Sequence, residues 1–399
     1  MAKQLQDAYI VAATRTPIGK SGRGNFKNTR PDDLLVTALR AALAQVPTLD
    51  PKAIEDAIVG CSFPEAEQGM NVARVGALLA GLPNSVGGVT VNRFCASSLT
   101  AVQMAADRIR VGEADVMIAG GCESMSMVPM SGNKPSFNPA VFERDENVGI
   151  AYGMGLTAEK VAQQWKVSRE AQDEFALQSH LKAIRAIDSG ELQDSITPVE
   201  VIERIPDLDT GEVIRKARTV NVDEGPRRDT SLESLAKLKP VFAAKGSVTA
   251  GNSSQTSDGA GALILASEKA VTQFGLQPLA RFVSFASRGV PPEIMGIGPI
   301  EAIPAALRSA GLTLDDLGWI ELNEAFAAQA IAVIDSVGLN REVVNPYGGA
   351  IALGHPLGAT GAIRSAQLIH AMRRHGRKYG MVTMCVGTGQ GAAGIFEAV

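Results

Sequence analysis

Four short segments, far apart in the chain, carry residues that together suit sulfur chemistry on an acyl group. Cys95 lies in VNRFCASSLTA, Asn323 in NEAFA, His355 in GGAIALGHPLGATGA and Cys385 in MCVGTGQG. A cysteine thiolate is a strong nucleophile, and a nearby imidazole can take the proton of the thiol. Glycine and other small residues surround both cysteines and the histidine, which is typical of turns where backbone approaches a ligand closely.

Cys95 follows a strand-like run, VTVN, and precedes a helical run, SSLTAVQMAADRIR. A helix N-terminus is partly positive and has free N–H groups, so this position favours thiolate over thiol and can also hold an oxyanion. The alternative is a small buried cysteine that only packs. Position and motif favour the nucleophile for Cys95, whereas Cys61 and Cys122 are predicted to be packing residues.

His355 lies between Gly354 and Pro356, which predict a sharp turn before another helix. An imidazole held there takes the proton of Cys95 and then, as imidazolium, donates to an oxygen that gains charge. The other histidines are interpreted as surface or satisfied polar residues, with His370 and His375 at a solvated helix end.

Cys385 ends a predicted strand before Gly387 and Gly389, and an exposed thiol is expected there. The GTGQG run is not a dinucleotide fingerprint, because only AAGIFEAV follows and no βαβ unit can be completed. Asn323 follows the strand WIEL. Its carboxamide either holds a water or donates toward a substrate carbonyl, or it caps the next helix, and spacing alone leaves both open.

Composition narrows the class of protein. The chain has 399 residues, 45% apolar and 20% charged, as an ordinary globular protein has. A net charge of −4 gives no general reason to bind nucleic acid. No apolar run approaches the roughly 20 residues that span a bilayer, and the N-terminus lacks a signal-peptide pattern, so a cytoplasmic location is expected. Four cysteines without paired spacing predict free thiols and no metal site.

The two ends of the chain repeat each other weakly. Residues 51–67 are echoed by 312–328, and EADVMIAGGCES by YGMVTMCVGTGQ. Short apolar strands alternate with helical stretches, which indicates parallel strands joined by helical crossovers, an α/β class. The segment from 122 to 249 is richer in Met, Pro and charge and is predicted to be an insertion. Within it, a helix is expected after Ser168, ending near Gly190.

These motifs resemble those of the thiolase family, and the resemblance runs from AYIVAATRTPIGK, with Arg15, Thr16 and Pro17, to the last strand. It implies duplicated five-stranded βαβαβαββ halves in a layered α/β/α/β/α core with an inserted loop domain. The implied domains are an N-terminal half at 1–121 plus 250–273, a CoA-binding loop insertion at 122–249 and a C-terminal half at 274–399.

The resemblance also implies roles for the four motifs. Cys95 would accept the acyl group, His355 would activate it, and Cys385 would be the general acid and base for the acetyl-CoA carbon. His355 and a water on Asn323 would form one oxyanion site, and the backbone N–H groups of Cys95 and Gly387 the other. The implied reaction is thiolytic cleavage of 3-ketoacyl-CoA by coenzyme A in fatty acid β-oxidation, with no metal or redox cofactor.

Coenzyme A contacts are carried over in the same way. Arg227 would lie near the adenine, and Ser234 and Ser254 near the pantetheine, and Met154 is grouped with these binding residues. Short-chain acetoacetyl-CoA thiolases commonly read YHMG where this chain reads Tyr152–Gly155, YGMG. The missing imidazole leaves room for a longer acyl chain, with methionines as flexible lining, namely Met125, Met127, Met130 and Met154.

Three other readings stay open at this point: a biosynthetic acetoacetyl-CoA thiolase, a decarboxylating condensing enzyme, and a non-catalytic acyl-CoA or lipid binding protein. NEAFA argues against the decarboxylating enzyme, which would want a histidine at Asn323, and the retained cysteines argue against the binder. The resemblance further implies a homodimer or homotetramer, with a possible complex with other β-oxidation enzymes.

Overall fold

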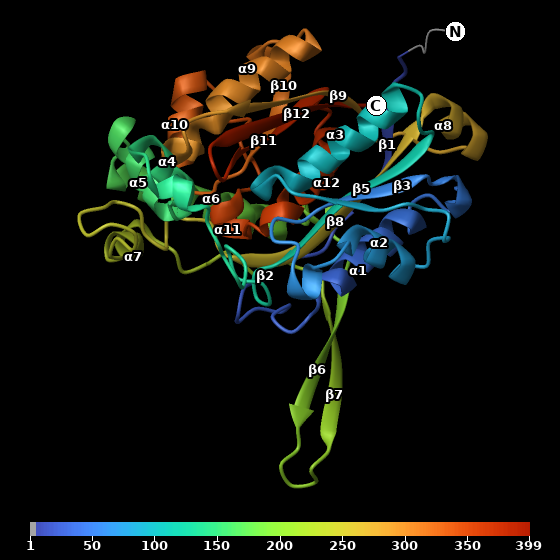
Figure 1. The fold of residues 1–399 in the computed structure, drawn as a ribbon, viewed down its shortest axis with the longest axis horizontal. Coiled ribbons are helices and arrows are strands. Elements are labelled where there is room, and N and C mark those ends of the chain that lie inside the picture. The colour runs from blue at the N-terminus through green and yellow to red at the C-terminus, as the bar shows by residue number, and fades with distance from the viewer. Residues whose placement is uncertain (1–4) are drawn as a thin grey trace.

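A computed structural model describes residues 5–399, which form two α/β halves that share one sheet (Figure 1). The N-terminal half contributes β1 (Ala8–Arg15), β3 (Asp56–Gly60), β4 (Val89–Val91), β5 (Val116–Ser124) and β8 (Ser257–Ser267), with a short β2 (Gly19–Lys20) paired to β8. The C-terminal half contributes β9 (Ala280–Gly289), β10 (Leu317–Leu322), β11 (Tyr379–Val386) and β12 (Gln390–Ala398). The strand order is β10-β11-β12-β9-β1-β8-β5-β3-β4.

The two halves repeat one topology. β3 runs parallel to β5 and β10 parallel to β11, while β8 and β12 are the antiparallel partners of β5 and β11. The halves meet where β1 pairs with β9 over two residue pairs. In the C-terminal half, the counterpart of β4 is a single parallel bridge between Ile320 and Val344. Pro346 follows, and a proline has no N–H with which to continue a ladder.

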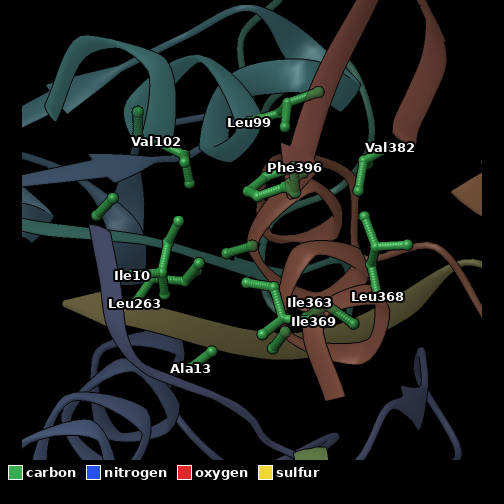
Figure 2. Close-up of a cluster of buried hydrophobic side chains, with 14 of the residues drawn as sticks. Ile10, Ala13, Leu99, Val102, Leu263, Ile363, Leu368, Ile369, Val382 and Phe396 are labelled. Atoms are coloured by element: carbon green, nitrogen blue, oxygen red, sulfur yellow. The ribbon is translucent and has the colours of Figure 1, made fainter. Parts of the chain in front are cut away.

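Two long helices lie between the halves. α3 (Ser97–Arg110) packs against α12 (Thr360–Arg374), whose side chains are buried from Thr360 to Ile369. Figure 2 shows Leu99 of α3 beside Phe396 of β12, in a buried cluster that also contains Val102 of α3 and Ile363 of α12. A helix that is buried on all sides serves a core rather than a surface, so the start of each helix is fixed firmly.

Outer helices cover the other sheet faces. α1 (Pro31–Ala44) and α2 (Val72–Leu79) pack on the N-terminal half, and α9 (Gly298–Ala310) and α10 (Ala327–Val337) on the C-terminal half. A short α8 (Glu268–Phe274) links β8 to β9. The predicted α/β/α/β/α layering is therefore confirmed.

The insertion lies at one side of this core and contains α4 (Asp145–Val148), α5 (Met154–Gln164), α6 (Arg169–Asp188), β6 (Val199–Pro206), β7 (Val213–Val220) and α7 (Leu232–Ala236). α6 is the helix predicted after Ser168, whose hydroxyl caps it by accepting from the Ala171 N–H. Gly190, in the left-handed region at φ +72°, follows its end. β6 and β7 form a hairpin that projects from the body (Figure 1).

The end of α12 is exposed from Arg373 through His375, as predicted for a solvated helix end. His370 is half-buried, and its Nε2 donates to the Ala13 carbonyl at 2.9 Å. His375 stacks on Trp319 with ring centroids 5.3 Å apart. The HAMRRH run gave no sign of this contact, because the partners come from β1 and β10. Within residues 5–399, no helix is both long and apolar enough to cross a bilayer.

Candidate active site

The four motifs converge where the central helices begin. Cys95 lies in a short 3₁₀ turn directly before α3. His355 lies between α11 (Ala350–Leu353) and the 3₁₀ turn that opens α12. Cys385 is near the end of β11, and the Asn323 N–H donates to the Thr383 carbonyl of that strand at 2.9 Å. Two equivalent helices of a duplicated fold thus present a thiol and an imidazole at one seam.

Cys95 is 8% exposed, and the residue before it is held in an unusual conformation. Phe94 has φ +43°, which lies in the left-handed region that residues other than glycine seldom adopt. Burial raises the pKa of the Cys95 thiol to about 12, although the backbone N–H groups of Gly387 and Cys95 act to lower it. The prediction that the helix start favours thiolate is therefore wrong, because desolvation of the charge outweighs the two N–H groups.

Cys385 is fully buried, so the predicted exposed thiol is wrong. It pairs with Gly391 of β12 and packs in an apolar cluster with Met154, Met295 and Phe326. Burial raises the pKa of the Cys385 thiol well above its usual value, and the neighbouring Cys95 adds to this effect. The insertion, through Met154, supplies part of the cover that a local sequence pattern could not reveal.

His355 is held by its neighbours on both ring nitrogens. Its Nδ1 lies 2.6 Å from the Thr360 hydroxyl, and its Nε2 lies 3.3 Å from Asn323 Nδ2. The His355 N–H donates to Ser257 Oγ at 3.1 Å. Burial, with a smaller effect of the Arg364 cation, lowers the pKa of His355 to about 3. The imidazole is therefore neutral at neutral pH.

Glycine is required just before this histidine. Gly354 has φ +106°, and a Cβ there would lie 2.5 Å from Ser257 Oγ. We call residues 349–358 the His355 turn. Its sharp backbone places the imidazole beside Asn323, as the family resemblance implied, and beside Thr360, which was not predicted. A hydroxyl at the first residue of the next helix was the available signal.

Asn323 has an open acceptor. Its Oδ1 is buried and has no hydrogen-bond partner among residues 5–399. Such an atom fits an ordered water, since buried polar groups are normally satisfied by protein or solvent. The alternative that Asn323 caps the next helix is wrong, because Phe326 occupies the N-cap of α10.

An apolar cavity of about 420 Å³ borders Cys95. Its wall includes Phe63, Phe94, Met130, Phe137, Ile150, Gly153, Met154, Leu357 and Gly387. Met130 and Met154 therefore line it as predicted, whereas Met125 and Met127 do not. Met125 is instead buried, and its sulfur accepts from the Ser257 N–H at 3.3 Å. The phenylalanines, which come from three separate segments, were not predicted.

The residues predicted to contact coenzyme A divide into two places. Arg227 borders two cavities, one of about 170 Å³ shared with Ser234 and one of about 580 Å³ shared with Ser254. Met154 lies apart from them, in the cavity beside Cys95. The neighbouring Arg228 is exposed and pairs with Asp188, so only one of the two arginines faces the cavities.

Two further groups surround Arg227 that the sequence did not single out. Lys20 lines the larger cavity, and burial lowers its pKa, with the charge of Arg227 as the next cause. His180 is buried in α6, and its Nδ1 accepts from the Arg227 N–H at 3.1 Å. Burial and the Arg227 charge lower the pKa of His180 to about 4. The interpretation of His180 as a satisfied polar residue is correct. Its hydrogen-bond partner is the backbone N–H of Arg227, the residue predicted to bind coenzyme A.

Known proteins match the chain from end to end. The family models for the thiolase N-terminal domain and the thiolase C-terminal domain match residues 8–269 and 276–398. A 3-ketoacyl-CoA thiolase of Bacillus subtilis is 49% identical over 396 residues, 98% of this chain and 100% of that protein.

Solved structures give the same result. A Bacillus anthracis acetyl-CoA acetyltransferase superposes with a TM-score of 0.89 at 40% identity, covering 100% of both chains. Human mitochondrial 3-ketoacyl-CoA thiolase gives 0.88 at 39% identity, covering 99% of both. Fold, motifs and similarity agree over the full length, so this chain belongs to the thiolase family.

Proposed function

We propose that this chain is an acyltransferase that cleaves 3-ketoacyl-CoA with coenzyme A, giving acetyl-CoA and a shortened acyl-CoA. The observation that carries the proposal is that Cys95 lines an apolar cavity, with Cys385 next to it and the Asn323–His355 pair at the same junction of the central helices. The named relatives, a 3-ketoacyl-CoA thiolase and an acetyl-CoA acetyltransferase, both fit this chemistry.

The first half of the reaction forms an acyl-cysteine. Cys95 Sγ attacks the 3-keto carbon while His355 takes the thiol proton. The carbon–carbon bond then breaks, and its electron pair becomes the enolate of acetyl-CoA. Cys385 gives its proton to that carbon, and acetyl-CoA leaves.

The second half regenerates the free thiol. Coenzyme A gives its thiol proton to the Cys385 thiolate and attacks the acyl group on Cys95, which leaves as the shortened acyl-CoA. The Cys95 sulfur departs as thiolate and takes back the proton held by His355. Negative charge develops on the enolate oxygen in the first half and on the acyl oxygen in the second. His355 with a water on Asn323 would support the former, and the N–H groups of Cys95 and Gly387 the latter.

Burial suits this mechanism. Burial favours a neutral Cys95 thiol and a neutral His355 imidazole, so no ion pair is stored and proton transfer accompanies substrate attack. Once substrate fills the cavity and excludes water, each hydrogen bond to a developing charge becomes stronger.

The cavity beside Cys95 supports acyl chains longer than acetyl. Its wall is mostly apolar, and Gly153 stands in it where a histidine would narrow the space.

The second candidate is a biosynthetic acetoacetyl-CoA thiolase, and the similarity to an acetyl-CoA acetyltransferase supports it. Cleavage assays on 3-ketoacyl-CoAs from about four to about sixteen carbons separate the two. Comparable or higher activity on longer chains supports the first candidate, and a steep preference for four carbons supports the second.

The cavities around Arg227 would hold coenzyme A. Lys20 and Arg227 bring positive charge to a chain whose net charge is −4, so phosphate groups would be met locally. Ser234 and Ser254 lie along the same surface and could bond the amide groups of the pantetheine arm.

A homo-oligomer is supported by one edge of the sheet. β4 is the terminal strand, and exposed apolar side chains lie on it and on the nearby α2, namely Val75, Leu78, Leu79 and Val89. An unpaired edge beside apolar surface suits pairing with a second copy. Light scattering on the purified protein would give the mass of the assembly, and a monomer at micromolar concentration would contradict this part of the proposal.

A further inference from the structure

The His355 turn is attached to the rest of the protein by two buried carboxylates, one from each half. Glu324 follows Asn323 and is 2% exposed. One of its oxygens accepts from the Ile351 N–H at 3.2 Å and from Ser179 Oγ at 2.6 Å, and the other from Asn345 Nδ2 at 2.9 Å. This carboxylate therefore joins the NEAFA segment, α6 and α11.

The second carboxylate belongs to Glu123, in β5 of the N-terminal half. It is 1% exposed. Its Oε2 accepts from the N–H groups of Gly358 and Ser62, each at 2.8 Å, and its Oε1 accepts from Gln68 Nε2. Glu123 therefore ties the far end of the His355 turn to the end of β3.

The two attachment points, Ile351 and Gly358, lie on either side of His355. Glycines let the turn come this close: a Cβ on Gly349 would lie 2.0 Å from the Glu324 carboxyl carbon, and one on Gly358 would lie 2.8 Å from Glu123 Oε2. The turn is thus built around the two carboxylates.

We infer that Glu123 and Glu324 are positioning residues, which fix the His355 imidazole against Asn323 by holding both ends of its turn. The hydrogen bonds of both carboxylates run to the turn and to its supports, so both act through the turn rather than on substrate. Burying a carboxylate is costly unless hydrogen bonds repay it. Two such residues around one histidine indicate that its placement needs them.

This inference rests on the proposed function, and kinetics of the purified full chain test it. Glu123→Gln and Glu324→Gln keep the side-chain size but replace one acceptor oxygen with an NH2 group. This group cannot accept a hydrogen bond from the backbone N–H groups of the turn. A misplacement of about 1 Å in a catalytic group can cost about a hundredfold in rate. We expect kcat for thiolysis to fall by about tenfold to a hundredfold, with KM for coenzyme A unchanged.

Glu321→Gln is the matched control. Glu321 is equally buried in the adjoining β10, and it bonds Trp319, Arg364 and Gln367 without touching the His355 turn. We expect it to lower the melting temperature while kcat stays near that of the parent. Unchanged kcat in the two test variants, or equal losses of kcat in all three, would overturn the inference.

Milder variants serve if a glutamine variant does not fold. Ser179→Ala and Gln68→Ala each remove one donor and leave the carboxylate in place. A fall in kcat of a fewfold at constant KM is expected, and unchanged kcat in both would contradict the inference. A parent protein without thiolysis would instead refute the proposed function.

Discussion

Asn323 and His355 are 32 positions apart in the sequence, yet Nδ2 of the asparagine lies 3.3 Å from Nε2 of the histidine. Each follows a different element of the C-terminal half, and the contact exists because β10 and the His355 turn meet at the seam. With the unpartnered Asn323 Oδ1 beside it, the pair forms a place where an oxygen that gains charge can be stabilised.

Asn323→Ala should separate the two halves of the reaction. The substitution removes the carboxamide that would bind the proposed water. The steps through the enolate should therefore slow by about a hundredfold to a thousandfold. Acetylation of Cys95 by acetyl-CoA relies on the N–H groups of Cys95 and Gly387 and should change much less. Single-turnover acetylation and steady-state cleavage, measured on one preparation, give the two rates. Equal losses in both would contradict separate oxyanion sites.

Cys385→Ser should leave acyl transfer largely intact but slow exchange of the acetyl-CoA methyl protons with solvent. A serine hydroxyl is a far weaker acid than a thiol, so it cannot shuttle this proton efficiently. Deuterium uptake from heavy water into acetyl-CoA, followed by mass spectrometry, measures the step. Exchange at the rate of the parent protein would assign the acid and base role to another group.

Alkylation of Cys95 should speed up steadily with pH in the ligand-free protein. Its thiol pKa is raised from 9.0 to about 12, so the thiolate fraction grows about tenfold per pH unit through the neutral range. The same sign applies to stability: folding favours the thiol, and this contribution is lost only as pH rises from about 9 toward 12. Iodoacetamide labelling of the Cys95 peptide from about pH 6 to 9 measures the rate. A plateau near pH 7 would reveal a preformed thiolate.

Arg227→Gln should weaken coenzyme A binding, with Arg228→Gln as its neighbour and control. Both arginines are exposed, but Arg227 borders both cavities whereas Arg228 is paired with Asp188. Loss of one phosphate contact is worth about 1.4 kcal/mol or more, or about tenfold in KM for coenzyme A. The Arg228 variant should stay within about twofold of the parent. Equal effects in the two variants would remove the special role of Arg227.

Much of the fold could be predicted from the sequence, because its signals are local. The α6 helix has a serine cap and a glycine stop, and the buried strands are continuous apolar runs. The shared sheet was not predicted, since the pairing of β1 with β9 spans only two residue pairs and joins segments some 270 positions apart. The domain boundaries at 121/122, 249/250 and 273/274 stay predictions.

The candidate site, like the fold, could be predicted from the sequence only in part. Cys95, His355, Asn323 and Cys385 carry their chemistry in their residue types, and turns of small residues mark three of them. Their protonation could not be predicted, because the burial that raises both thiol pKa values and lowers that of His355 comes from distant segments. The supports of the site, Glu123, Glu324 and Thr360, have ordinary side chains whose role depends on what lies opposite them.

The most direct test of the account is where an acyl group becomes attached. The parent protein is mixed with acetyl-CoA, quenched in acid and digested, and the peptides are analysed by mass spectrometry. The account predicts one acetyl group per chain on the peptide that holds Cys95, and none in Cys95→Ser. Acetylation of another cysteine, or no covalent adduct in a protein that still turns over substrate, would contradict it, and binding without any adduct or turnover would indicate a non-catalytic acyl-CoA binding protein.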